Sequence, residues 1–222
     1  YEKNDLPQEE KNRLVEPLKC YRKKFIEAIN FNVDLVLSVS RRVYDIALKM
    51  GINEEKIKVS YIGSRVADHA LGHANCGYDG EHFSLIYMGY QRTDKGYYFL
   101  AEVLNKMPID ISKRIDITLA AKKIPNSKYK DIEINKDKFH SFVSKDGYLL
   151  KEMPNLLKEK NLGIIPVLWE DNLPQVAIEM TAYGVPVLAS DLGGASELCE
   201  DDGFIFKGGD VDDCIDKITY FV

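Results

Sequence analysis

The sequence has little of what marks several large classes of protein. No apolar run approaches the ~18 residues that a transmembrane helix needs, and the opening residues YEKNDLPQEEKNRL lack the apolar stretch of a signal peptide. Basic residues are not in excess, since 30 lysines and arginines face 35 acidic residues and the net charge is −5. No basic face for duplex nucleic acid is obvious, so nucleic acid is not an expected partner.

Cysteine is also scarce. Only four cysteines are present, and none forms a CxxC pair, which is typical of a reduced, cytoplasmic protein. Apolar residues make up 45% of the chain and charged residues 29%, values that argue against disordered, collagen-like and coiled-coil proteins. The length of 222 residues predicts one large domain, or one domain with part of another.

What the sequence does contain is an alternation of short apolar runs with amphipathic stretches. Residues 14–29 have helical spacing, 34–40 and 56–62 predict strands (the first of them buried), and Ser40 and Gly51 suit the two ends of an intervening helix. Further strands are expected at 84–88, 115–121, 138–143, 163–168, 186–190 and 203–206, and helices at 95–107, 148–159, 174–183 and 210–220. Apolar strands alternating with helices predict a parallel sheet covered on both faces. Residues 63–82 show no period, which indicates a linker or domain boundary.

Ligands of such sheets bind beyond the carboxyl ends of the strands, and the first polar cluster there is Met88–Gly96, MGYQRTDKG. Gly89 allows a tight turn, while Arg92 and Lys95 add positive charge next to a helix N-terminus. This combination suits an anionic diphosphate; a solvated turn with two surface cations is the alternative. Neither GxxxxGK[ST] nor GxGxxG is present.

The other two clusters follow later strands. Asp171 is expected at the start of a helix and Glu179 two turns further on, in an otherwise apolar stretch. Carboxylates accept hydrogen bonds from sugar hydroxyls, and a buried acid needs a partner or a ligand; an acid favoured by the helix dipole is the alternative for Asp171. In the third cluster, Gly193 and Gly194 permit close approach of the backbone to a ligand, or simply begin a helix.

The sequence gives little support for a metal site. Four possible zinc ligands lie in the irregular segment, but without the spacing of a zinc knuckle: His69, His73, Cys76 and His82. Asp210 and Asp212 resemble a DxD motif, yet they stand at an expected helix start, where a capping role is favoured. We therefore expect no metal.

In their order along the chain, three of these segments resemble the donor-binding half of GT-B glycosyltransferases, and in particular the retaining enzymes of glycosyltransferase family 4. DLVLSVSRRVYDIALKMGINEEKIKVSYIG is similar to the end of that family's first domain, and FSLIYMGYQRTDKGYYFLAEVL to the opening of its second. LGIIPVLWEDNLPQVAIEMTAYGVPVLASDLGGASEL is similar to its most diagnostic stretch, with an acid, seven residues, a glutamate, G-x-P-V and GG-x-x-E.

The resemblance implies a Rossmann-like parallel α/β domain of GT-B type, preceded by the tail of another domain. Residues 1–66 would be the C-terminal part of the acceptor-side domain, 67–82 a linker, and 83–222 the donor-binding domain. The first domain of such enzymes has roughly 150–200 residues, an ordinary domain size. The chain therefore looks truncated relative to the family, and it can be inactive by itself.

The resemblance also implies a function and a set of site residues. The activity would be retaining transfer of a sugar from a nucleotide-diphosphate-sugar donor to a glycan or lipid-linked acceptor, in polysaccharide or glycoconjugate biosynthesis. Lys95 would bind the diphosphate and Asp171 the donor sugar, as the catalytic pair, while Glu179 would hold the ribose hydroxyls. The remaining donor-binding positions would be Gly89, Tyr90, Arg92, Gly96, Val143 (through its backbone, in the loop after FHSF), Asn172, Leu173 and Pro174.

Two residues depart from the family pattern: Tyr90 replaces the usual arginine, and Asp171 replaces the usual glutamate. Both changes affect donor binding, so the donor preference can differ. No cofactor and no obligatory metal are implied, because protein cations stabilise the phosphates. The alternatives are a GT-B nucleotide-sugar epimerase and a non-catalytic nucleotide-sugar-binding module. A cytoplasmic location is expected, which leaves open a peripheral membrane association through parts outside this chain.

Overall fold

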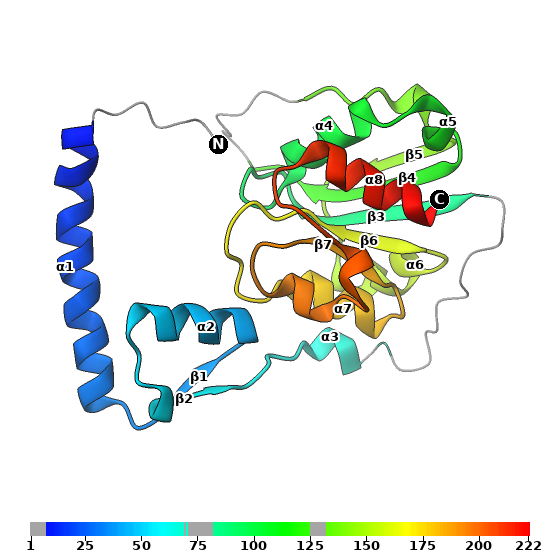
Figure 1. The fold of residues 1–222 in the computed structure, drawn as a ribbon. Helices are drawn as coiled ribbons and strands as arrows, with labels where there is room; N and C mark the ends of the chain where they lie inside the picture. Colours follow the sequence, from blue (N-terminus) through cyan, green and yellow to red (C-terminus); the bar gives the residue numbers. More distant parts are fainter. Residues whose placement is uncertain (1–7, 69, 71–81, 125–131) are drawn as a thin grey trace. The chain divides into compact units, whose positions relative to one another are not determined.

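The computed structural model describes residues 8–68, 70, 82–124 and 132–222 (Figure 1). The chain divides into two compact units, Tyr1–Tyr61 and Ile62–Val222. The sequence expects the transition later, in a linker over 67–82, and most of that linker falls outside the described residues. None of the described helices is both long and apolar enough to cross a bilayer.

The first unit contains helix α1 (Gln8–Asn32), strand β1 (Val36–Ser38), helix α2 (Arg41–Met50) and strand β2 (Ile57–Val59). The two strands pair in parallel, with Val36 opposite Ile57. The expected boundaries of α2 are confirmed: the Ser40 hydroxyl accepts a hydrogen bond from Val43 N at 3.1 Å, and Gly51 adopts a left-handed φ of 102°. The expectation of a buried strand at 34–40 is wrong within this unit, because Leu37 is 57% exposed in a sheet of only two short strands.

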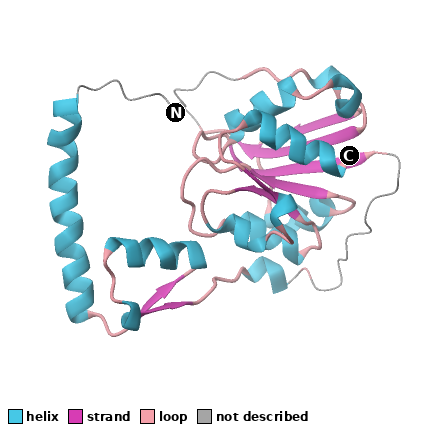
Figure 2. Cartoon of the chain, viewed as in Figure 1, coloured by secondary structure: helices cyan, strands magenta, loops and turns pink. Residues whose placement is uncertain are grey.

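The second unit is a six-stranded, entirely parallel sheet in the order β5-β4-β3-β6-β7-β8 (Figure 2). Its strands are β3 (Phe83–Tyr90), β4 (Ile115–Lys122), β5 (Ser141–Lys145), β6 (Leu162–Ile165), β7 (Val187–Ser190) and β8 (Ile205–Phe206). Its α-helices are α3 (Arg65–Asp68), α4 (Tyr97–Lys106), α5 (Ile109–Ser112), α6 (Met153–Leu157), α7 (Gln175–Ala182) and α8 (Val211–Phe221). The predicted α/β class and parallel pairing are therefore confirmed.

Helices cover both faces of this sheet, as the apolar strands predict. Side chains alternate along β3, so Leu85 and Tyr87 pack in one apolar cluster with α4 and α8, while Ile86 and Met88 pack in a second with α6 and α7. The helices themselves can be followed around the sheet in Figure 1. Because β3, β6 and β7 are neighbouring parallel strands, their carboxyl ends lie next to one another. These three neighbouring ends are where the predicted site residues meet.

Two expected elements differ in detail. The helix predicted over 148–159 is a 3₁₀ turn at Leu150–Glu152 followed by the short α6, because Pro154 suits only the first turn of a helix and Glu159 takes a left-handed φ of 59°. The aspartate pair after Gly209 is a helix cap as expected, with the Asp210 carboxylate accepting from Asp213 N at 3.3 Å.

Candidate functional site

The candidate site lies at the carboxyl ends of β3, β6 and β7 and is formed by the three loops that follow them. The loops after β3 and β6 touch directly, since Leu168 N donates to Asp94 O at 3.0 Å. Gly96 makes this approach possible: its φ is +73°, and a Cβ there would lie 1.6 Å from the Pro166 carbonyl oxygen. Two of the three sequence-predicted clusters are therefore packed against each other at the start of α4.

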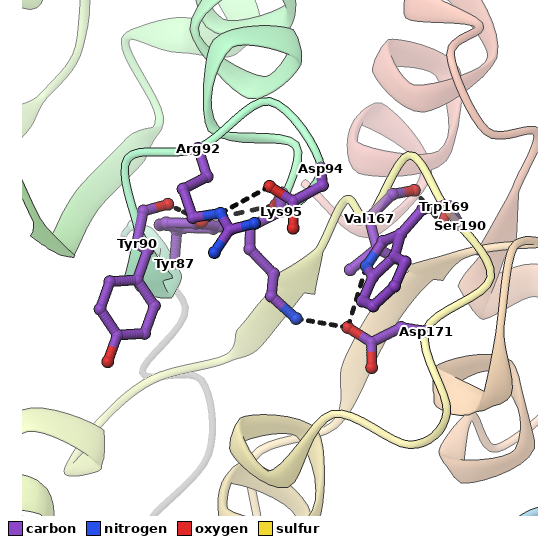
Figure 3. A network of polar contacts seen from close by, with 9 residues as sticks. All are labelled: Tyr87, Tyr90, Arg92, Asp94, Lys95, Val167, Trp169, Asp171 and Ser190. Atoms are coloured by element: carbon purple, nitrogen blue, oxygen red, sulfur yellow. Dashed lines mark hydrogen bonds and ion pairs between the residues drawn. The ribbon is translucent and has the colours of Figure 1, made fainter. Parts of the chain in front are cut away.

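Lys95 and Asp171 form the centre of the site (Figure 3). The Lys95 ammonium lies 2.5 Å from Asp171 Oδ2, although 76 residues separate them in the chain. Asp171 is only 8% exposed, whereas the Lys95 side chain is 30% exposed. The two residues that the sequence predicts to bind opposite ends of one ligand thus form an ion pair with each other.

Trp169, the single tryptophan of the chain, completes this centre. Its indole Nε1 donates to the same Asp171 oxygen at 3.2 Å, and the Lys95 ammonium lies 5.3 Å from the centre of its ring (Figure 3). A charged carboxylate with two donors on one oxygen has a fixed orientation, and its other oxygen remains available to a ligand. The indole therefore positions both charged groups.

The loop after β7 supports Asp171 from the other side. Gly194 N donates to the Asp171 carbonyl at 2.9 Å, and Gly193 N donates to the Glu170 carboxylate at 3.1 Å. A Cβ on Gly193 would lie 2.4 Å from the Asp171 carbonyl oxygen, at a φ of +78°. The paired glycines are needed for close packing of two loops, in addition to any approach to a ligand.

The end of β3 places Tyr90 and Arg92 at the rim. The Tyr87 hydroxyl donates to Tyr90 O at 2.8 Å, and burial raises the pKa of Tyr87 so that the phenol stays protonated. The Tyr90 side chain itself is exposed. Arg92 Nε pairs with Asp94 at 2.7 Å rather than with Asp171, and its guanidinium is half-exposed (Figure 3).

Glu179 is buried on α7, 6% exposed, as the apolar sequence around it predicts. Burial raises the pKa of its carboxyl, and a hydrogen bond from the Ser64 hydroxyl, 3.1 Å from Oε1, opposes that shift. Its charge also acts on Tyr148. The pKa of Tyr148 is raised to about 12, first by burial and then by the charges of Glu179 and Tyr90. Tyr148 is therefore close enough to both the α7 acid and Tyr90 to feel their charges.

The remaining predicted positions divide into two groups. Asn172 is exposed, while Leu173 and Pro174 are buried, and Pro174 precedes the first residue of α7 with no side-chain cap. The sequence predicts that Val143 lies in a loop. In the structure Val143 lies within β5, where it pairs with Thr118. The error arose because β5 begins three residues later than expected and extends to Lys145, past Val143.

Three residues of this region are not among the sequence predictions: Ser64, Tyr148 and Trp169. Ser64 lies in the segment interpreted as an irregular linker, and its partner is 115 residues away, so no local pattern could reveal it. Trp169 was detectable as a lone tryptophan directly before two acids. Of the four possible zinc ligands, His69, His73 and Cys76 lie outside the described residues.

Known proteins resemble this chain in sequence and in fold. The profile of the family described as "Glycosyl transferases group 1" matches residues 82–222. An Escherichia coli UDP-Gal:alpha-D-GlcNAc-diphosphoundecaprenol alpha-1,3-galactosyltransferase is 30% identical over 70 residues, which are 31% of this chain and 18% of that enzyme. An uncharacterised 41.2 kDa protein in the cps region of Klebsiella pneumoniae is 25% identical over 173 residues, 76% of this chain and 46% of that protein.

Solved structures show the same fold. Anabaena HepE, in complex with UDP and glucose, has a TM-score of 0.64 at 18% identity, covering 91% of this chain and 57% of that one. A glycosyltransferase from Rickettsia africae has a TM-score of 0.68 at 18% identity, covering 89% and 56%. The chain thus spans about half the length of these structures.

The family profile covers well over half of the chain, and the parallel sheet matches the Rossmann-like domain of GT-B glycosyltransferases. The chain therefore belongs to the group 1 glycosyltransferases.

Proposed function

We propose that the protein transfers a sugar from a nucleoside-diphosphate-sugar donor to a glycan or lipid-linked acceptor, with retention of configuration, as in glycosyltransferase family 4. The observation that carries this proposal is the Lys95–Asp171 pair at the carboxyl edge of the sheet. Membership of the group 1 family supports the reaction class. HepE was solved with UDP and glucose, and the Escherichia coli relative is a UDP-galactose enzyme with a lipid diphosphate acceptor.

The ion pair suggests how the donor is received. A diphosphate carries more charge than one carboxylate and accepts more hydrogen bonds, so it competes well for the Lys95 ammonium. Release from Lys95 leaves Asp171 held by Trp169, free to accept hydrogen bonds from the donor sugar. The two groups neutralise each other in the structure, which lowers the cost of burying the Asp171 carboxylate.

The loop between β3 and α4 offers further support for an anionic ligand. It leads into the ten-residue helix α4, whose N-cap residue Gly96 has no side chain to cap the helix. Among the buried polar side-chain atoms of the described residues, the Thr93 hydroxyl in this loop is without a hydrogen-bond partner. A buried hydroxyl without a hydrogen-bond partner is unusual in a folded protein, and a bound ligand or water would supply that partner.

The chemistry assigned to this site is charge stabilisation. The bond between the anomeric carbon and the β-phosphate oxygen breaks, a bond from the anomeric carbon to the acceptor hydroxyl oxygen forms, and the acceptor proton passes to the departing diphosphate. The nucleoside diphosphate leaves with the bonding electron pair, and Lys95 stabilises the negative charge that develops on it. We propose that a protein cation fills this role without an obligatory metal ion, so chelators should leave donor binding unchanged.

A calorimetric titration of the chain with UDP, ADP and GDP tests the donor site. At least one should bind, and Lys95→Ala should weaken that binding about tenfold or more, since a charge-assisted hydrogen bond contributes ~1.5–3 kcal/mol. Arg92→Ala should have a smaller effect, because its guanidinium already pairs with Asp94. Lys207→Ala, an exposed lysine on a different loop, is the matched control. Equal affinity of wild type and Lys95→Ala would refute the site.

Turnover requires a second experiment, with this chain joined to the rest of an acceptor-side domain. A retaining enzyme fed an α-linked nucleotide sugar gives an α-linked product, which is read from the anomeric proton coupling by NMR. A β-linked product would contradict retention. Donor binding with no transfer to any acceptor would favour the non-catalytic module.

A further inference from the structure

A second polar cluster lies at the opposite, amino-terminal edge of the same sheet. The register of the three adjacent strands places Ser84, Asp116 and Ser141 in one row across β3, β4 and β5. His82 stands just before β3, two residues from Ser84 and so on the same face, and His140 stands just before β5. These residues belong to three segments that are distant in sequence and converge only in the fold.

The side chains of this cluster are already in contact. Asp116 Oδ1 accepts hydrogen bonds from His140 Nδ1 at 2.8 Å and from the Ser141 hydroxyl at 2.5 Å. The His82 ring is stacked on the His140 ring, with centroids 3.4 Å apart and planes 9° from parallel. One ligand atom from each of His82, Asp116 and His140 lies within 4.8 Å of the others.

The cluster also borders open space. A cavity of about 500 Å³ adjoins it, lined among others by Asp116, Lys158 and Lys160. Lys158 pairs with Glu159 at 3.3 Å, while Lys160 Nζ donates to the Ser84 hydroxyl at 3.2 Å and also interacts electrostatically with Asp116. A bound ion could therefore keep a water or another ligand in an open coordination position.

We propose that His82, Asp116 and His140 form a binding site for a divalent transition-metal ion, with zinc as the best-fitting ion. Two imidazoles and one carboxylate are ligands that zinc shares with cobalt and nickel, whereas magnesium and calcium favour sites made of oxygen alone. Tetrahedral zinc with ligand bonds of ~2.0–2.1 Å needs ligand atoms about 3.3 Å apart. The three ligand atoms lie within 4.8 Å of one another, so binding the ion requires these side chains to move closer together.

The electrostatics of the aspartate favour the ion. Desolvation acts to raise its pKa, but the hydrogen bonds from Ser141 and His140 outweigh that effect and hold the pKa of Asp116 below its usual value. A metal here would fasten the amino ends of three neighbouring strands, on the edge remote from Lys95 and Asp171. Its effect is on the stability of the sheet, not on the donor.

The test uses the whole 222-residue chain without a histidine tag, stripped with chelator and titrated with Co²⁺ and Zn²⁺ by absorption spectroscopy and calorimetry. One ion should bind per chain in the micromolar range and raise the melting temperature. His82→Ala, His140→Ala and Asp116→Asn should each weaken binding at least about tenfold, since even the loss of an outer-shell partner costs 10–100-fold. Circular dichroism checks that each variant is folded. If His140→Ala does not fold, His140→Asn is used in its place.

Two controls distinguish this site from binding by neighbouring side chains or by the segment before β3. Ser84→Ala should bind the ions as wild type does, because Ser84 lines the cavity without belonging to the ligand set. A His69→Ala, His73→Ala, Cys76→Ser triple variant should also bind as wild type. Three results would overturn the proposal. They are loss of binding in the triple variant alone, a thiolate-to-cobalt charge-transfer band, and a dissociation constant that is not below about 100 μM. UDP affinity measured with and without the metal should be equal, so the outcome is independent of the donor site.

Discussion

At the scale of single residues, Lys95 and Asp171 form an ion pair with each other, and we propose that the same two side chains bind the donor. The pair gives the Asp171 side chain, in a residue that is only 8% exposed, a cationic partner, and a buried carboxylate without one is costly. It also couples the phosphate and sugar ends of the proposed donor, because one group cannot be engaged without releasing the other. The substitution of Asp171 therefore separates the two contributions.

Asp171→Asn should remove the preference of the site for a nucleotide sugar over the bare nucleotide. The amide cannot act as a charged acceptor for sugar hydroxyls, which costs ~1.5–3 kcal/mol, or about tenfold or more. Affinity for the nucleoside diphosphate should be unchanged or higher, because Lys95 no longer has a competing carboxylate. Calorimetry with the two ligands measures the ratio, and Asp94→Asn, which alters the partner of Arg92, is the control. Equal losses for both ligands would show that Asp171 acts on the fold instead.

Glu179→Gln should weaken ribonucleotide binding while leaving the 2′,3′-dideoxy nucleotide almost unaffected. One carboxylate can accept from both ribose hydroxyls, whereas the amide keeps the volume but loses the charge and one acceptor. The ratio of the two affinities, measured by calorimetry, is the readout. Ser64→Ala is the matched variant, because it leaves the carboxylate but removes its hydrogen-bond partner. Equal losses for the two nucleotides would assign Glu179 a structural role.

The stability of the unliganded protein should respond to pH through the same residue. Burial raises the pKa of Glu179, so between the unfolded and folded pKa values the folded chain binds more protons than the unfolded chain. The stabilisation is fully present below the unfolded pKa of ~4.3 and is lost as the pH rises through the folded pKa. Glu179→Gln should therefore unfold at higher urea than wild type at neutral pH, and the difference should shrink on acidification. Exposed Glu200→Gln should show no such trend.

At the scale of elements, the sequence was most informative where a pattern is local. The apolar runs predicted all six strands of the main sheet to within a few residues, and Ser40 and Gly51 marked both ends of α2. The sequence failed where the deciding contact is remote. The strand that contains Leu37 has the composition of a buried strand, yet Leu37 is exposed. The Ser64 hydroxyl donates to the carboxylate of Glu179, 115 residues further along the chain. The cluster at His82 and Asp116 depends on strand order, which no periodicity records.

The turn between β3 and α4 should not tolerate a side chain at Gly96. Gly96→Ala would place a Cβ 1.6 Å from the Pro166 carbonyl oxygen and hold alanine at a φ of +73°. The backbone strain alone costs ~1–3 kcal/mol, and the clash must also move one of the two loops of the site. Urea unfolding and UDP titration should both show a loss. Gly63→Ala is the control, because no atom lies within 4 Å of its Cβ position; equal effects of the two changes would contradict the assigned contact.

At the scale of the whole molecule, the sequence and the structure place the start of the second unit at different residues. The resemblance to known enzymes starts that domain at residue 83, whereas the compact unit starts at Ile62. The difference is physical. Ala70 is buried in the apolar cluster of α6 and α7, Val66 packs on the same cluster, and the Ser64 hydroxyl bonds the Glu179 carboxylate.

A chain of residues 62–222 should therefore be more stable than a chain of residues 83–222. Removing the first segment exposes the apolar surface that Ala70 and Val66 cover, at a cost of ~1–3 kcal/mol, and leaves the Glu179 carboxylate buried without its donor, at a similar cost. Urea unfolding of the two chains measures the difference directly, and the longer chain should unfold in one cooperative transition. Its UDP affinity should equal that of the full 222 residues, because every described residue of the donor site lies beyond Tyr61. Equal midpoints for the two truncated chains would show that residues 62–82 contribute nothing to the unit, and would move its boundary back to the position that the sequence predicts.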